Sequence, residues 1–470
     1  MRSLVIFARL APFVLSFARD RRRWLVAGAP VARTAAFHRR RAEALVAAIA
    51  ALGPTFVKLA QVLAARADLV PEPYLAALGT LHDQVPPVPF DAVRATIAES
   101  YGAPAEATFE RIDEVPLAAA SLGQVHRARH RGREVVVKVL RPGVEALVRA
   151  DLRAARKLLA PVARRWPTRH VLALQAAVEE FGRRVWEEMD FRREAANAEE
   201  IRRNFAEHAG LVVPRVVDEL TRERVLVLEY VEGRRVDALD GWIADGRVRP
   251  RALVRTVMEM YVQMMLVDGF FHADPHPGNL LVAPDGRLVL LDFGMVVRVP
   301  RGTRLALVRT VFAAIRRDVD EIIRGFQALG ILAADADLEP IRDLAGRLLA
   351  LASAHATVPE KMEQLLADEV MHELYDAPVT LPSDLVYFAR TAALIEGLGT
   401  RYDPYFNPID FATPVALRLR GRILASLSAE PPEYEWAAFV GGLLGEVARV
   451  AQRAGRELVT IVGQRLLGAA

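Results

Sequence analysis

Apolar residues recur at helical spacing over residues 42–82. They follow one another at steps of three and four, which gives each predicted helix one apolar face: Leu45, Ile49, Leu52, Phe56, Leu59 and Leu63. A proline-rich stretch at residues 85–89 closes this pattern. We therefore expect an all-helical segment here.

Two pairs of short apolar runs have the pattern of β-hairpins. Residues 124–130 and 134–140 are rich in valine and are separated by an Arg-Gly pair. Residues 280–282 and 288–291 flank a Pro-Asp-Gly turn, and Asp-Gly between apolar runs is typical of a tight hairpin. Each pair predicts two antiparallel strands.

The remaining pattern is mainly helical. Residues 171–208 are charged and helical in period, and residues 225–230 form one more apolar strand. Beyond residue 233 one helix face is apolar: Val254, Val257, Met258, Tyr261 and Met265. Strands first and helices later indicate an α+β fold with a small sheet-bearing lobe and a larger helical lobe.

The pattern divides the chain into five parts. They are a basic, apolar N-terminal segment (1–41), a helical extension (42–107), a sheet-bearing N-lobe (108–232), a helical C-lobe (233–430) and a C-terminal amphipathic helix (431–470).

Composition narrows the classes of protein. Hydrophobic residues make up 52% of the 470 residues and charged residues 26%, which excludes wholesale disorder. Cysteine is absent, which excludes a disulfide scaffold, a thiolate zinc site and a cysteine nucleophile.

Positive charge is concentrated at the N-terminus. Residues 1–41 hold ten arginines and one acid, whereas the whole chain carries a net charge of +4. Residues 4–18 are apolar but interrupted by Arg9, and they fall short of the roughly 20 residues that span a bilayer. A helix lying on an anionic membrane fits this pattern, as does a terminal helix docked on the body. The apolar segment 436–470 allows the same two interpretations.

The strongest chemical signal lies around the second hairpin. Asp274 and Asn279 share one loop, and Asp292 ends the last hairpin strand, which folds it back beside Asn279. Mg²⁺ prefers carboxylate, amide and phosphate oxygens. Asn279 and Asp292 can therefore hold metal on a nucleotide, which leaves Asp274 to orient or deprotonate an acceptor hydroxyl. His272 and His276 could instead bind zinc, but no third ligand cluster accompanies them.

A cation for the nucleotide phosphates is available in the first hairpin. Lys138 lies within a valine-rich strand, and burying a lysine there is costly unless an acid pairs with it. Glu194 is the candidate partner, and Asp190 lies four residues before it on the same predicted helix. Glu187 and Glu188 offer further carboxylates.

The loop expected over the phosphates has an unusual composition. Glycines normally let the backbone approach a nucleotide, but this loop contains Ala118, Ala119, Ala120 and Ser121, with Gly123 alone remaining. Each Cβ limits the approach of the backbone, so we expect a nucleotide pocket of altered geometry.

Together these residues resemble the UbiB/AarF-type atypical kinases. The stretch 52–61 is similar to that family's Lys-x-Gly-Gln motif, and residues 188–190 match its Glu-x-Asp motif. Further matches are the alanine-rich loop, the residues that follow the first motif and the kinase core: Arg66, Asp68, Leu69, Pro71, Ala118–Ser121, Lys138, Glu194, Asp274, Asn279 and Asp292. The family glycine of the first motif is Ala60 here.

The resemblance implies a two-lobed, protein-kinase-like fold with the helical extension packed over the active site. It implies Mg-ATP between the lobes, catalytic Lys138, Glu194 and Asp274, and metal on Asn279 and Asp292. Nucleotide contacts would come from residues 118–121, Lys138 and Glu229, and regulation from Lys58, Gln61, Glu188 and Asp190. Because the Lys58 helix would occupy the peptide site, an ATPase or a kinase for a small or lipid-like acceptor is expected rather than an ordinary protein kinase.

The same resemblance implies a place in ubiquinone or other isoprenoid-lipid metabolism. The expected partners are ATP or ADP, anionic or isoprenoid lipid and proteins of lipid biosynthesis, with no nucleic acid. The expected location is cytoplasmic and peripheral to a membrane.

Two alternatives remain open from the residues. One is a nucleotide-gated scaffold or lipid-presenting protein without phosphoryl transfer. The other is an antibiotic-type phosphotransferase, which shares the Asp…Asn loop and the later Asp but not the Lys58–Gln61 helix.

Overall fold

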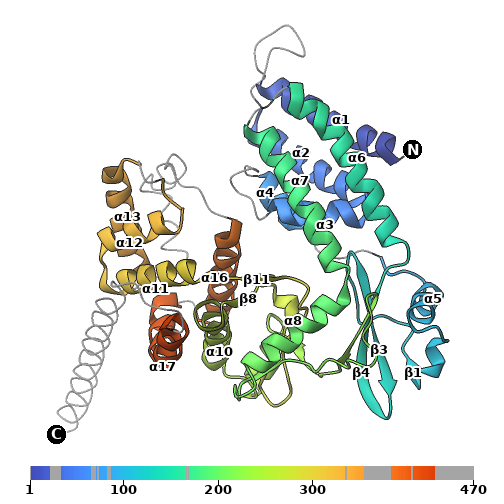
Figure 1. Cartoon of the computed structure of the whole chain (residues 1–470). Helices are drawn as coiled ribbons and strands as arrows, with labels where there is room; N and C mark the ends of the chain where they lie inside the picture. Colours follow the sequence, from blue (N-terminus) through green and yellow to red (C-terminus); the bar gives the residue numbers. More distant parts are fainter. Residues whose placement is uncertain are drawn as a thin grey trace. The chain divides into compact units, whose positions relative to one another are not determined.

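The computed structural model describes residues 2–21, 33–64, 70, 73–81, 86–165, 167, 169–333, 336–353, 383–403 and 406–428 (Figure 1). The chain divides into two units, each described here by itself. Unit 1 comprises Met1–Ala238 and His276–Val296, and unit 2 comprises Leu239–Pro275 and Val297–Ala470. The expected C-terminal helix (431–470), part of the basic N-terminal segment and Arg66, Asp68, Leu69 and Pro71 lie outside the described residues.

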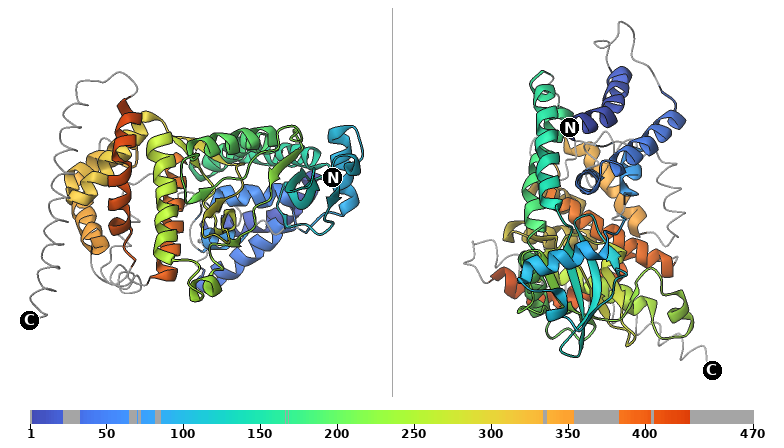
Figure 2. Two further views of the ribbon diagram at one scale, coloured as in Figure 1. Left: turned by 90° about the horizontal axis from the view of Figure 1, so that it is seen from below. Right: turned by 90° about the vertical axis from the view of Figure 1, so that its right-hand side faces the viewer.

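Unit 1 begins with a helical assembly, as the apolar period predicts (Figure 2). Its helices are α1 (Arg2–Arg21), α2 (Ala35–Ala50), α3 (Pro54–Ala64), α4 (Tyr74–Gly79), α6 (Val144–Arg165) and α7 (Arg169–Glu188). All of them except α7 share a core that includes Leu52, Phe56 and Ala60, whereas α7 buries Val178, Phe181 and Val185 in a second core. The methyl group of Ala60 is 2% exposed, so it contributes packing where the resembled family has glycine.

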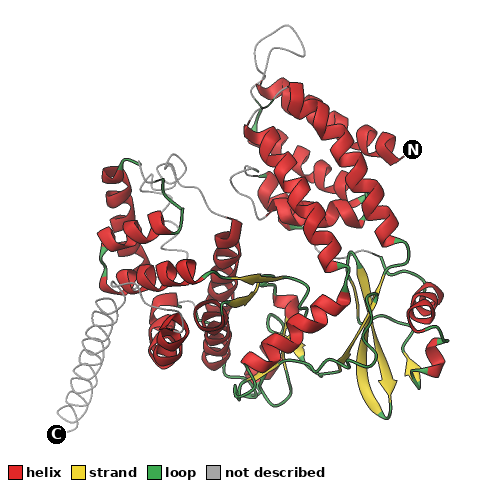
Figure 3. Cartoon of the chain, in the orientation of Figure 1, coloured by secondary structure: helices red, strands yellow, loops and turns green. Residues whose placement is uncertain are grey.

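The main sheet of unit 1 is antiparallel, with strands in the order β1-β3-β4-β6 and β2 paired to β3 (Figure 3). Its strands are β1 (Arg111–Ile112), β2 (Ala118–Ala119), β3 (Gly123–His130), β4 (Arg133–Leu140) and β6 (Val225–Glu229). Arg131 and Gly132 have φ of 50° and 72°, the left-handed pair that joins a two-residue hairpin. The first predicted hairpin is therefore confirmed. Helix α5 (Phe90–Tyr101) packs on this sheet through Val93 and Ile97.

Residues 171–208 are mostly helical as expected, but they form two helices, and Asp190 precedes the helix of Glu194 rather than lying within it. Helix α7 ends at Glu188 and α8 (Phe191–Asn204) begins after a break. Asp190 caps α8, because its carboxylate accepts the backbone N–H of Arg192 at 3.1 Å. The Phe191 N–H donates to the Glu223 carbonyl at 2.9 Å, so it does not continue the hydrogen bonding of α7.

A second sheet of unit 1 contains the other predicted hairpin. Its order is β5-β10-β9-β7, built from β5 (Leu211–Val212), β7 (Arg234–Arg235), β9 (Leu280–Val282) and β10 (Leu288–Leu290). β9 and β10 are antiparallel, and Gly286 turns between them at φ 86°. This hairpin is confirmed, whereas β5 and β7 are too short to show a sequence period.

The described part of unit 2 consists of helices and a two-stranded sheet. Its elements are α9 (Asp240–Ala244), α10 (Pro250–Val262), the π-helical turn η2 (Gln263–Asp268), β8 (Phe270–His272), β11 (Val296–Arg298), α11 (Arg301–Arg316), α12 (Val319–Ala328), α13 (Leu338–Ser353), α16 (Ser383–Tyr402) and α17 (Pro408–Ser428). Val254, Val257, Met258 and Tyr261 are buried as predicted. Met265 is only half-buried, because the wider π turn moves the buried face to Met264 and Leu266.

Helix α1 is amphipathic and docked by one face. Arg2 pairs with Asp151 of α6 at 2.5 Å and Ile6 is 1% exposed. Several apolar side chains face outward in unit 1, with exposed fractions of 72% for Leu4, 56% for Phe7 and 59% for Val14. Among the described helices, none is both long and apolar enough to cross a membrane.

Candidate nucleotide-binding site

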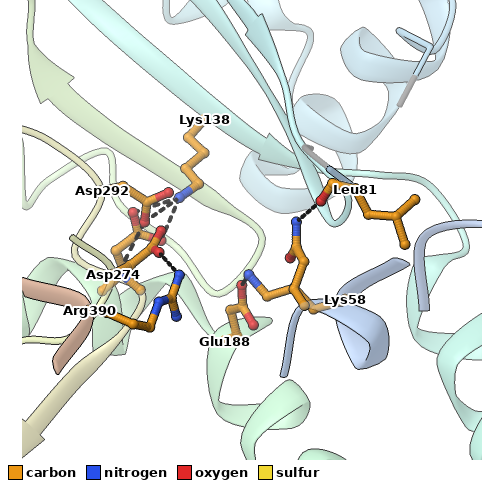
Figure 4. Close-up of polar contacts among 10 residues, drawn as sticks. Lys58, Leu81, Lys138, Glu188, Asp274, Asp292 and Arg390 are labelled. Atoms are coloured by element: carbon orange, nitrogen blue, oxygen red, sulfur yellow. Dashed lines mark hydrogen bonds and ion pairs between the residues drawn. The ribbon is translucent and has the colours of Figure 1, made fainter. Parts of the chain in front are cut away.

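Lys138 is held by two carboxylates in unit 1 (Figure 4). It lies in the middle of β4, opposite Val125 of β3 and Leu226 of β6. Its ammonium donates to both carboxylate oxygens of Glu194 on α8, at 2.7 and 2.9 Å, and lies 3.4 Å from Asp292 Oδ1. The expected pairing of Lys138 with Glu194 is present.

Burial and charge set the ionisation of this pair. Burial would lower the pKa of the Lys138 ammonium, but the charges of Asp292 and Glu194 and the hydrogen bond from Glu194 together raise it. Burial raises the pKa of Glu194 to about 7 against the lowering effect of Lys138, and Asp292 adds to the rise. The raised pKa keeps the Lys138 side chain charged at neutral pH.

A second ammonium lies on α3. Lys58 Nζ is 2.6 Å from Glu188 Oε1 at the end of α7, and the two side chains are 16% and 24% exposed. Gln61, one turn further along α3, donates to the Leu81 carbonyl at 3.0 Å. Burial raises the pKa of Glu188 against the opposing effect of Lys58. Lys58 and Gln61 thus fasten α3 within unit 1, as two side chains of one helix face.

Gly294 lies among the acidic side chains of the site. A Cβ on this residue would lie 3.2 Å from Asp292 Oδ1, 3.6 Å from Glu194 Oε2 and 3.8 Å from Glu188 Cγ. The Gly294 N–H donates to Asp292 Oδ1 at 3.1 Å. The close approach explains why glycine follows Asp292-Phe293 and shows that Glu188, Glu194 and Asp292 border one small volume.

Asp292 and Asn279 carry the oxygen ligands expected for a metal. Asp292 has φ of 56°, a left-handed conformation that aspartate tolerates better than most residues. The Leu291 N–H donates to the Asn279 carbonyl at 2.8 Å, so the hairpin aligns Asn279 with the residue before Asp292. Within the described ranges, no three or more His, Asp or Glu side chains are arranged to hold an ion by themselves. One carboxylate and one amide fit a metal that takes its other ligands from phosphate and water.

The alanine-rich loop is the end of a β-hairpin. Ala118 and Ala119 form β2, the Ala120 N–H donates to the Gly123 carbonyl at 2.9 Å, and Ser121 is 2% exposed. Gly123 lies beside Lys138, since a Cβ there would lie 3.8 Å from Lys138 Cγ.

Two side chains that the sequence pattern does not mark hold this loop by hydrogen bonds. The guanidinium of Arg141 donates to the Ala120 carbonyl at 2.9 Å and to the Pro86 carbonyl at 3.0 Å. Gln124, 1% exposed, accepts the Val88 N–H at 2.8 Å. No local pattern marks such contacts, although a polar residue inside an apolar strand, as at Gln124, is a usable signal.

The other two expected site residues are Asp190 and Glu229. Asp190 is the N-cap of the helix that carries Glu194, and hydrogen bonding from Arg192 lowers its pKa. Glu229 ends β6 with an exposed side chain, and its N–H donates to the Arg215 carbonyl at 2.8 Å.

Asp274 lies in unit 2, just after β8. Arg390 of α16 lies 3.5 Å from its Oδ1 (Figure 4). Tyr261 of α10 is fully buried nearby, and burial raises its pKa, with the charge of Asp274 adding to the rise. The sequence gives no sign of Arg390, because the loop of Asp274 lies more than a hundred residues earlier and no motif links the two.

The fold and this arrangement define a protein-kinase-like protein. A model of the ABC1 atypical kinase-like domain matches residues 80–325. The chain belongs to the ABC1 atypical kinase-like family, which confirms both the UbiB/AarF resemblance and the expected α+β, kinase-like fold with N-terminal helices.

Named relatives support this membership. An uncharacterized protein of Synechocystis sp. is 35% identical over 81% of this chain and 65% of its own length. The probable protein kinase UbiB of Aeromonas salmonicida is 34% identical over 78% of this chain and 68% of its own length. The chloroplastic protein Activity of bc1 complex kinase 8 of Arabidopsis thaliana is 33% identical over 78% and 52%. The chain thus spans about half to two thirds of the length of these relatives.

A solved structure has a similar fold. Rv3197 of Mycobacterium tuberculosis, described in complex with erythromycin, is 27% identical with a TM-score of 0.55, over 74% of this chain and 91% of that chain.

Proposed function

We propose that this chain binds Mg-ATP and transfers its terminal phosphoryl group to water or to a small or lipid-like acceptor. The transfer would support ubiquinone or other isoprenoid-lipid metabolism at a membrane surface. The observation that carries the proposal is the Lys138 ammonium, charged and fixed within 3.4 Å of both Glu194 and Asp292. Such an ammonium is suited to gripping nucleotide phosphates.

Each proposed step uses one group of the chain. Lys138 binds the phosphates while Glu194 keeps it in place. Asp274 accepts the proton of the acceptor hydroxyl or water, whose oxygen bonds to the γ-phosphorus as the bond to the β–γ bridging oxygen breaks and ADP leaves. Asn279 and Asp292 would hold Mg²⁺, which neutralises phosphate charge when bound.

The remaining residues shape access to this site. The backbone of residues 118–121 and Glu229 would contact the nucleotide, with the alanine methyl groups limiting its approach. The Lys58–Glu188 pair holds α3 beside one of the carboxylates, and the hydrogen bond of Gln61 holds it to the Leu81 carbonyl. A helix fixed in this way would oppose the binding of a peptide. Asp190 acts through the capped helix that carries Glu194.

Purified full-length protein tests the proposal directly. We expect a fluorescent ADP analogue to bind in the presence of Mg²⁺, and ATP to be hydrolysed slowly to ADP and phosphate. Asp292→Asn should weaken the Mg²⁺ dependence of binding, whereas Asp343→Asn, an exposed change on α13, should not. Failure of the wild-type protein to bind nucleotide would refute the proposal.

The membrane part of the proposal rests on α1. Its outward face presents Leu4 and Phe7, and Arg9 and Arg19 on the same helix are exposed. Apolar side chains beside arginines suit an interface with anionic lipid.

Vesicle binding measures this directly. Leu4→Ser combined with Phe7→Ser should lower partition of the protein into phosphatidylglycerol vesicles at least about tenfold, because two exposed apolar anchors are lost. A matched control is Val115→Ser with Leu117→Ser, which are exposed by 79% and 53% in the loop between β1 and β2. Equal vesicle binding by both double variants would show that α1 is not the contact.

A further inference from the structure

The loop that carries Asp274 has no permanently charged cation, because residues 270–279 contain neither lysine nor arginine. A phosphoryl group in transfer carries charge on three oxygens, and enzymes that move it place cations around those oxygens. A guanidinium or ammonium group beside Asp274 must therefore come from another element.

Arg390 is the cation that the structure brings to Asp274. Its Nη2 lies 3.5 Å from Asp274 Oδ1. Helix α16 is fixed where it meets the strand before Asp274, because the Phe388 ring packs edge-on against Phe271 of β8, with centroids 5.2 Å apart. Leu385 and Leu394 are buried on either side of Arg390 along the chain. The guanidinium therefore projects from an anchored helix.

The Arg390–Asp274 pair adds little as a structural contact. The two side chains are 39% and 35% exposed, and ion pairs this open to water contribute little to stability. Arg401 on the same helix makes a shorter pair with Asp240, at 3.0 Å. What distinguishes Arg390 is its partner, the carboxylate proposed to receive the acceptor proton, together with its own partial exposure.

We infer that Arg390 is a further catalytic residue, whose guanidinium leaves Asp274 to bind the phosphoryl group during transfer. A planar guanidinium can donate two parallel hydrogen bonds to phosphate oxygens, which a lysine cannot. The inference rests on the proposed function, because it takes Asp274 as the group beside the acceptor.

Steady-state ATP hydrolysis by full-length variants tests the inference. Arg390→Ala should lower kcat about 100-fold, the size of effect seen when one donor to a transition-state oxyanion is removed. Affinity for the fluorescent ADP analogue should stay within threefold. Arg390→Lys should keep part of the lost rate, and millimolar guanidinium chloride should partly restore Arg390→Ala. Arg401→Ala is the matched control and should keep the wild-type kcat.

The outcomes separate this inference from the proposed function. If the wild-type protein binds no nucleotide, the proposed function fails. If the wild type is active and Arg390→Ala is equally active or faster, the inference is overturned, since a faster variant would make Arg390 a restraint on Asp274. Slow Arg390→Ala with neither guanidinium rescue nor activity in Arg390→Lys would also overturn it, because a purely structural role predicts that result.

Discussion

Replacement of Asp274 by asparagine is expected to lower kcat for ATP hydrolysis about 1,000-fold, within the range for loss of a general base. The amide cannot accept the proton of the attacking hydroxyl, but it keeps the shape of the side chain. Nucleotide affinity should stay within twofold, because Lys138, Glu194 and Asp292 are unchanged. Single-turnover hydrolysis and fluorescent ADP titration measure the two quantities.

Asp343→Asn is the control for a carboxylate lost elsewhere on unit 2, since Asp343 is 74% exposed on α13. Hydrolysis by Asp274→Asn at the wild-type rate would show that Asp274 takes no part in the reaction. If cells keep the biological activity with a hydrolysis-dead Asp274→Asn protein that still binds nucleotide, the chain works as a nucleotide-gated scaffold.

Replacement of Lys138 by methionine is expected to abolish nucleotide binding and to destabilise unit 1 by about 3–5 kcal/mol near pH 8. Glu194 is 4% exposed and would be left as an unpaired buried anion. The urea midpoint of unfolding, followed by tryptophan fluorescence, measures the loss. Lys157→Met, a change at an exposed position on α6, should leave the midpoint unchanged.

The loss should depend on pH with a defined sign. Burial raises the pKa of Glu194 to about 7, and removal of Lys138 raises it further. A carboxyl group with a raised folded pKa contributes stability below its unfolded pKa and loses it as pH rises through the folded value. The destabilisation should therefore shrink as pH falls from 8 towards 5. Lys138→Met combined with Glu194→Gln should be more stable at pH 8 than Lys138→Met alone, and equal midpoints at both pH values would contradict the buried-anion explanation.

Much of the fold could be predicted because its signals are local. Both hairpins are visible from short apolar runs and a two- or three-residue turn, and the partner of Lys138 follows from the cost of burying an ammonium. The break before α8 was missed because Asp190 suits a helix surface as well as an N-cap. The buried face of η2 was predicted wrongly at Met265. The spacing of apolar residues by three and four does not reveal that a π turn is inserted.

Long-range polar contacts set the limit of prediction. Arg141, Gln124 and Arg390 act through partners far away in the chain, and each is an ordinary residue in its own helix or strand. The packing of α16 on β8 helps to bring Arg390 beside Asp274.

The volume around Gly294 has a consequence for how a ligand enters. Glu188, Glu194 and Asp292 outnumber Lys58 and Lys138, so the fully ionised cluster is anionic overall. A bare nucleoside triphosphate, itself a polyanion, would be repelled at close range. If the chain binds ATP as proposed, this negative charge would favour a triphosphate that already carries its divalent ion over the free triphosphate.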